Sequence, residues 1–275
     1  MKTLVVPVDF SSASLNAANY ALDFAQQINA SISLIYVCQV PVAVSEAPVA
    51  AATIQTIIDD AQKRILELKD ELLHKSSGKL NVFTEVKEGN VVTQVEDYCK
   101  SVNPYAVIMG ASGSNATERI LFGSSTLAAM KHISWPLIIV PKGVRFKNIS
   151  KIGLACDLRN VTKAIHADEI KKMVNDFHAQ LHILHVNTDK DKMIGDEEIE
   201  GSEWLRDMFM ELKPEFHFLN KETIEDTIND FAEKNNLDML IVVPKRHGLL
   251  EGIFHNSHTK KMALNTHVPM LSIHE

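Results

Sequence analysis

The hydrophobic residues of the chain gather in short continuous runs, separated by longer segments in which they recur with helical spacing. In the first half, the runs predict buried strands near Thr3–Asp9, Ser31–Val37, Leu80–Val86, Tyr105–Met109 and Leu137–Val140. Between the first two, a helical apolar face is formed by Ala18, Leu22, Ala25 and Ile28. Continuous apolar strands that alternate with amphipathic helices are typical of a parallel sheet covered on both faces. We therefore predict a doubly wound α/β fold, whose ligands bind beyond the carboxyl ends of the strands.

The same succession of runs occurs twice along the chain. The matching segments are Leu4–Phe10 and Ile152–Leu158, Ala30–Val37 and Ala179–Val186, Tyr105–Met109 and Asp238–Val242, and Trp135–Val140 and His267–Ile273. Pro136 and Pro269 fall in register in the last pair. We predict two tandem five-stranded parallel-sheet sandwiches, covering residues 1–145 and 149–275. The joint near Lys142 to Ser150 is short, which indicates a tight connection between the two.

A glycine-rich segment follows the fourth predicted strand of the first half. Gly110-Ala-Ser-Gly113 comes directly after Met109, and Gly123-Ser124-Ser125 opens a helical pattern further on. Glycine lets backbone N–H groups approach an anion, and a helix N-terminus adds unpaired donors and a partial positive charge. The arrangement favours a phosphate-binding loop. Glycines after a strand can also be plain turn formers, and that interpretation stays open.

Composition narrows the choice of partners. The 275-residue chain has a net charge of −7, which argues against a nucleic-acid backbone as its main partner. No apolar run approaches the length of a membrane span, and the chain enters a strand pattern at once, without a signal peptide. We expect a cytoplasmic protein. Cys38, Cys99 and Cys156 are widely separated and form no zinc-binding spacing, so buried free thiols are expected.

Two motifs resemble those of the universal stress protein family, and the whole chain resembles a tandem member of it. The motifs are Val6-Pro7-Val8-Asp9-Phe10-Ser11 and the Gly-x2-Gly-x9-Gly-Ser pattern that begins at Gly110. The resemblance implies an adenine nucleotide alpha hydrolase-like fold that binds ATP, with Mg²⁺, in the first domain. It implies that the nucleotide contacts Pro7, Val8, Asp9, Val37, Met109, Gly110, Gly113, Gly123, Ser124 and Ser125.

Each of these assignments has a structural alternative. Asp9 could cap the helix that follows it, a role compatible with adenosine recognition. Val37 and Met109 could be ordinary core residues, and Arg119 could be a phosphate partner or a solvated loop residue. The resemblance also implies that the last strands, Leu137–Val140 and Met270–Ile273, pair so that the two domains form an intramolecular pseudo-dimer. Further homodimerisation through other surfaces stays open.

The second half departs from the glycine pattern. Val243, Arg246 and Asn256 stand where the first half has glycines, and Asp157 and Ser257 persist. Side chains at Val243 and Arg246 block close backbone approach to a triphosphate, so we expect one nucleotide per chain. A mononucleotide or other small ligand in the second half stays open. The basic run Lys245–His247 could bind an anion or be a solvated loop.

Histidine is concentrated in the second half, but the sequence predicts no metal site. His182 and His185 lie three apart on a predicted strand, so their side chains point to opposite faces. His255 and His258 would share a helical face, without a neighbouring cysteine or carboxylate. The Pro/Ala/Val-rich segment 39–52 could be a flap over the first site or a turn.

Catalytic signatures are missing from the sequence. No Walker lysine follows a glycine loop, no GxSxG elbow occurs, and no convincing base for phosphoryl transfer is found. We expect a nucleotide-dependent sensor or regulator of a stress response, with an adenine nucleotide as ligand and a protein partner still to be identified. The alternatives are a slow ATPase or phosphotransferase, and a scaffold with a vestigial nucleotide pocket.

Overall fold

The computed structural model describes residues 1–39, 48–111, 124–158, 166–187, 195–220, 223–243 and 267–273, apart from the side chains of 48–53 and of Ser124. The described residues up to 146 form one compact unit, and those from 147 form a second. We call these unit 1 and unit 2 and consider each by itself. Among the described residues, no helix is both long enough and apolar enough to cross a bilayer.

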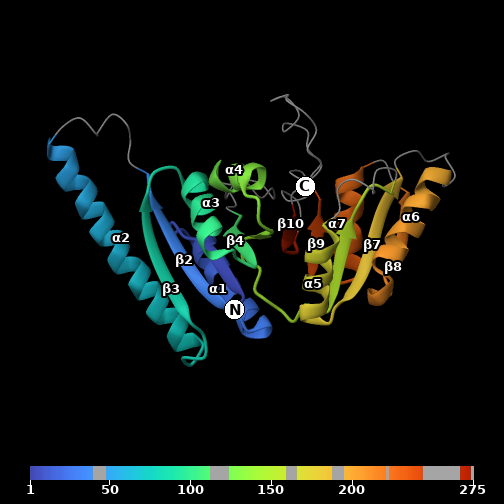
Figure 1. Ribbon diagram of the computed structural model, residues 1–275, viewed down its shortest axis with the longest axis horizontal. Helices are drawn as coiled ribbons and strands as arrows, with labels where there is room; N and C mark the ends of the chain where they lie inside the picture. The colour runs from blue at the N-terminus through green and yellow to red at the C-terminus, as the bar shows by residue number, and fades with distance from the viewer. Residues whose placement is uncertain are drawn as a thin grey trace. The chain divides into compact units, whose positions relative to one another are not determined.

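Unit 1 is a parallel sheet with helices packed against it (Figure 1). Its strands are β1 (Thr3–Pro7), β2 (Ser31–Cys38), β3 (Val82–Glu88), β4 (Ala106–Gly110) and β5 (Leu137–Val140). They lie in the order β3-β2-β1-β4-β5, and all the pairs between them are parallel. Its helices are α1 (Ser12–Ile28), α2 (Pro48–Lys75), α3 (Val91–Val102) and α4 (Ser124–His132). This confirms the predicted doubly wound α/β fold.

The core of unit 1 follows from its apolar strands and the small residues of α1. Strands β1, β4 and β5 are buried almost throughout, and α1 turns a row of alanines inward. Helix α2 runs alongside β3 at the outer edge of the sheet (Figure 1). Helix α3 is tied to β2 by Tyr98, whose hydroxyl lies 2.5 Å from Ser33 Oγ. Phe146 packs edge-on against Tyr20 and Phe24 of α1, which holds the last residues of unit 1 to its core.

Unit 2 repeats this topology. Its strands are β6 (Lys151–Ala155), β7 (Gln180–Asn187), β8 (Glu215–Asn220), β9 (Met239–Val242) and β10 (Met270–Ser272). They lie in the order β10-β9-β6-β7-β8 and are also parallel. Its described helical segments are α5 (Ala167–Phe177), α6 (Asp196–Met208), the short 3-10 helix η3 (Met210–Leu212) and α7 (Ile224–Lys234).

The cysteines of both units are free. Cys38 ends β2, Cys99 lies on the buried side of α3, and Cys156 follows β6. Burial raises the pKa of the Cys99 thiol to about 12, and it does the same for Cys156. At neutral pH these thiols are therefore protonated and only weakly nucleophilic.

Candidate functional site

The chain reverses its direction of travel across the unit 1 sheet at β1. It runs outward from β1 to β2 and β3, then crosses back to place β4 and β5 on the other side of β1. The carboxyl ends of β1 and β4 therefore border a topological switch point, the place where open α/β sheets bind their ligands. Asp9 follows β1, and Gly110 ends β4. These two residues mark the candidate site.

The apolar residues predicted for the site lie mainly in the core. Pro7 is the buried last residue of β1, and Val8 is only 4% exposed, with its N–H donating to the Ile35 carbonyl at 2.9 Å. Val37 in β2 and Met109 in β4 are also buried. Their side chains therefore pack inside the protein, and what they offer to a ligand at the strand ends is backbone.

Asp9 is held in a hydrogen-bonded turn between β1 and α1. The Ser11 N–H donates to Asp9 Oδ1 at 2.9 Å, and the Asp9 N–H donates to Ser14 Oγ at 3.3 Å. Partial burial raises the pKa of Asp9, but hydrogen bonds from Ser11 and Ser14 outweigh burial and hold it below the usual value. Although neighbouring residues partly surround its carboxylate, Asp9 still faces solvent, so the fixed carboxylate can also accept hydrogen bonds from a ligand.

An aromatic and cationic stack lies beside Asp9, and sequence reasoning missed it. Phe10 has a φ of 62°, which is rare for a residue with a side chain. Its ring stacks on Tyr36 of β2 at 5.3 Å, and the Arg64 guanidinium of α2 lies 4.1 Å from the ring centre. Burial is the main cause that raises the pKa of Tyr36. The only sign of this stack in the sequence was an aromatic residue, Phe10, directly after the aspartate that follows the first strand.

Gly110 brings the start of α1 against the end of β4. A Cβ at this glycine would lie 2.2 Å from the Ala13 carbonyl oxygen, far inside contact distance. The Gly110 carbonyl accepts a hydrogen bond from Thr126 Oγ1 of α4 at 3.3 Å. Only glycine therefore allows this seating of α1, and the same residue is linked to the first turn of α4.

Two helix N-termini thus meet the end of β4. Ser11 caps α1 by accepting a hydrogen bond from the Ser14 N–H, and neither α1 nor α4 has an acidic residue in its first turn. Ser124 begins α4 and Ser125 is half-buried behind it. Gly113, Arg119 and Gly123 lie outside the described residues, as do the side chain of Ser124 and most of segment 39–52.

Unit 2 has a different construction at its own switch point, between β6 and β9. Strand register places Val243 where unit 1 has Gly110. Helix α5 begins only at Ala167, well beyond Asp157, whereas α1 begins directly after Asp9. The Leu158 N–H donates to His185 Nδ1 at 3.3 Å. A Cβ on Gly201 of α6 would lie 2.0 Å from the Leu158 carbonyl oxygen, so α6 packs tightly over this turn.

Comparison with known proteins agrees with the fold and the motifs. Residues 1–141 match the family model described as the universal stress protein family. A universal stress protein of Methanocaldococcus jannaschii is 27% identical over 142 residues, which are 51% of this chain and 82% of the relative. The chain belongs to the universal stress protein family.

Solved structures extend the likeness over both units. A universal stress protein from Archaeoglobus fulgidus DSM 4304 has a TM-score of 0.77 at 18% identity, covering 99% of this chain and 98% of that one. A functionally unknown protein from Pseudomonas aeruginosa PAO1 has a TM-score of 0.67 at 13% identity, covering 100% and 92%. At these identities the likeness concerns the fold. The chain is about twice as long as the segment that matches the family model, as expected for a tandem member of the family.

Proposed function

We propose that unit 1 binds ATP at the β1–β4 switch point and that nucleotide occupancy makes the protein a sensor or regulator. The observation that carries the proposal is the seating of α1 on Gly110, which brings a helix N-terminus to the end of the strand beside Asp9. An anion at that place is favoured by the helix dipole and by exposed backbone donors. Family membership of this half of the chain supports the same ligand.

The described residues suggest how the nucleotide would be oriented. Asp9, fixed by Ser11 and kept ionised, is suited to accept hydrogen bonds from ribose hydroxyls. Backbone at Pro7, Val8, Val37 and Met109 borders the adenine side. In this orientation the phosphates, with Mg²⁺, are bound by Gly113 and Gly123 before α4 and by Ser124 and Ser125 at its start. These assignments are part of the proposal.

Isothermal titration of ATP with Mg²⁺ into the full chain tests the site. Gly123→Val should remove most of the affinity, because a branched side chain blocks the phosphates. Asp9→Ala should weaken binding by about 1–3 kcal/mol, the value of a hydrogen bond to a charged group. Gly78→Val is the control for backbone strain alone, since Gly78 also has a positive φ, of 70°, but lies between α2 and β3, at the amino end of the sheet. Equal binding by wild type and Gly123→Val contradicts the proposal.

We further propose that one ATP binds per chain. In unit 2, Val243 places a side chain where Gly110 has none, and α5 begins at Ala167, ten residues after Asp157, whereas α1 begins three residues after Asp9. Titration should give a stoichiometry of one, and Gly123→Val should abolish it. Two equivalent sites, or one site that survives the substitution, would assign the nucleotide to unit 2 as well. Steady release of ADP in the same samples would indicate an ATPase instead of a sensor.

A further inference from the structure

Three side chains able to ligate a metal gather on one face of the unit 2 sheet, away from its switch point. In the parallel pairing of β7 with β8, His182 is the partner of Glu215, and Leu184 is the partner of His217. Because side chains two apart on a strand share a face, His182, Glu215 and His217 lie on the same side of the sheet. Among the described residues, these three form a group that could hold a metal ion.

The distances within the group suit one small divalent ion. His182 Nδ1 lies 3.0 Å from His217 Nε2 and 3.5 Å from Glu215 Oε2, and His217 Nε2 lies 3.9 Å from the same oxygen. In a tetrahedral zinc site, with bonds of about 2.0–2.1 Å, two ligand atoms lie about 3.3 Å apart. The three separations bracket this value, so small side-chain movements would let all three atoms bind a common ion.

We propose that unit 2 binds one divalent ion of the zinc class through His182 Nδ1, His217 Nε2 and a Glu215 carboxylate oxygen, with a fourth position open to water. Two imidazoles and one carboxylate are ligands that zinc prefers. This site is separate from the nucleotide site proposed for unit 1 and does not depend on it.

Burial supports the assignment. The His182 side chain is only 8% exposed, His217 is 25% exposed and Glu215 is 58% exposed, so the group is anchored inside and reachable from solvent. The His217 ring packs on Phe231 of α7, with centroids 4.6 Å apart, which limits its movement. His182 Nε2 is buried without a hydrogen-bond partner among the described residues, so the polar contacts of this ring are made through Nδ1, toward the group.

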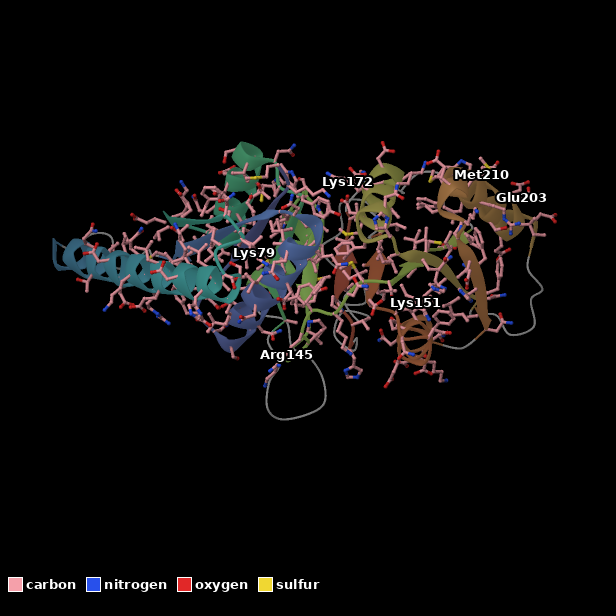
Figure 2. The ribbon with its side chains drawn as sticks, turned by 90° about the horizontal axis from the view of Figure 1, so that it is seen from below. Lys79, Arg145, Lys151, Lys172, Glu203 and Met210 are labelled. Atoms are coloured by element: carbon pink, nitrogen blue, oxygen red, sulfur yellow. The ribbon has the colours of Figure 1, made fainter. Side chains whose placement is uncertain are left out.

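The electrostatic surroundings favour neutral imidazoles. Burial lowers the pKa of His182 and of His217, and it outweighs the opposing effect of Glu215. Lys151 at the start of β6, labelled in Figure 2, adds a positive charge that lowers the pKa of His182 further. Its Nζ donates to the Asn235 carbonyl at 3.2 Å. Metal ions bind the neutral form of histidine. The competing account is a plain hydrogen bond between the two imidazoles, with no ion.

The test is zinc binding to the full chain after treatment with a chelator and buffer exchange. Competition between the protein and a chromophoric chelator for Zn²⁺ at pH 7.5 should give one site per chain. His217→Gln and Glu215→Gln should each weaken it by at least tenfold. Co²⁺ in place of Zn²⁺ should give a visible absorption that His217→Gln removes. Glu215 is mostly exposed, so its substitution keeps the test valid if the histidine variant folds poorly.

Two controls separate this group from other histidines. His166→Gln changes a half-exposed histidine of unit 2 outside the group and should leave the affinity unchanged. The double variant His255→Gln/His258→Gln removes the pair that shares a predicted helical face, and it should also bind zinc as wild type does. The proposal is overturned if wild type binds no zinc at micromolar concentrations. It is equally overturned if His217→Gln and Glu215→Gln bind as wild type, or if the double variant alone loses the site.

Discussion

Gly110 shows how one missing methyl group shapes the end of the unit 1 sheet. The sequence predicted this glycine as part of an anion-binding loop, by its place after a strand. The structure gives it a packing role as well, because its Cα faces the backbone of Ala13. Anion binding and helix packing both require a residue without a side chain, so the residue type alone does not tell which of the two roles Gly110 has.

Gly110→Ala should therefore destabilise unit 1 even without nucleotide. The added Cβ would lie 2.2 Å from the Ala13 carbonyl oxygen, and backbone cannot move aside as a flexible side chain can. Overpacking costs about 1–3 kcal/mol, and so close an approach to backbone should cost the upper end of this range, about 3 kcal/mol. Urea unfolding measures the loss. Gly143→Ala is the comparison, because nothing lies within 4 Å and only its φ of 75° opposes the change, at about 1 kcal/mol. Equal losses would show that α1 is not seated on Gly110.

The ionised Asp9 carboxylate contributes to the unfolding free energy of unit 1, and this contribution depends on pH. Its pKa in the folded protein lies below the ordinary 3.8, so its contribution is full above about pH 4. The contribution is lost as the pH falls through the lower, folded value. Asp9→Asn keeps an oxygen that can accept from Ser11 but cannot titrate. The difference in unfolding free energy between wild type and this variant should shrink as the pH falls below about 4, and a constant difference would contradict the prediction.

The predicted site residues illustrate what sequence can provide at this scale. Pro7, Val8, Val37 and Met109 lie at the strand ends where the apolar runs placed them, but whether their side chains face the core depends on packing. Arg64 lies on α2, far along the chain from Phe10, so their contact could not be predicted without knowing where α2 lies. His182 and His217 meet only through the register of two strands.

At the scale of elements, the apolar strands were predicted well and the edge strand less well. The run Leu80–Val86 predicted the third strand, which spans Val82–Glu88. Strand β3 is the edge strand of unit 1, because it pairs there with β2 alone. Its residues include the ion pair of Glu85 with Lys87, so the strand continues beyond the apolar run that predicted it. Charged residues on such an edge also discourage pairing with other chains.

The N-terminus of α1 offers a way to separate folding from binding. Ser11 is its N-cap, and aspartate is an equally good capping residue. Ser11→Asp should therefore keep the cap, but it replaces the Ser11 side-chain hydrogen bond to Asp9 by a second carboxylate, so a modest fall in the unfolding free energy is expected. It should weaken ATP binding several-fold, because a new negative charge lies near the phosphates, and it should weaken adenosine binding less.

The matched control is Asn90→Asp, which adds the same charge to the capped N-terminus of α3. That variant should bind ATP as wild type does. If both variants weaken ATP binding equally, the effect is one of net charge and α1 is not part of the site. If Ser11→Asp binds ATP normally, the phosphates lie elsewhere.

At the scale of the whole molecule, the repeated succession of apolar runs in the sequence predicted that both units have the same topology. Both units show the strand order expected of a doubly wound sheet. The late start of α5 was not predicted, because the residues between Asp157 and Ala167 give no clear helix signal. Domain bounds of 1–145 and 149–275, and the pseudo-dimer, stay predictions.

Hydrogen exchange can test the predicted pairing of the last strands. In β5, amides that donate to β4 are protected in any case, and alternate amides point away from it. If Leu137–Val140 pairs with Met270–Ile273, these outward amides should exchange as slowly as the inward ones, over hours instead of seconds. Fast exchange of the outward amides in both strands would refute the pseudo-dimer.

The free thiols give each unit a native reporter of its own opening, from the buried Cys99 in unit 1 and the partly exposed Cys156 in unit 2. Cys38 and Cys99 belong to unit 1 and Cys156 to unit 2, and high pKa values keep Cys99 and Cys156 protonated. Alkylating reagents attack the thiolate, so the buried Cys99 should react only in molecules whose unit has transiently opened, and the partly exposed Cys156 should react slowly because of its raised pKa. Mass spectrometry of the alkylated peptides would then follow local unfolding of the two halves separately. Addition of ATP should slow alkylation at Cys99 more than at Cys156.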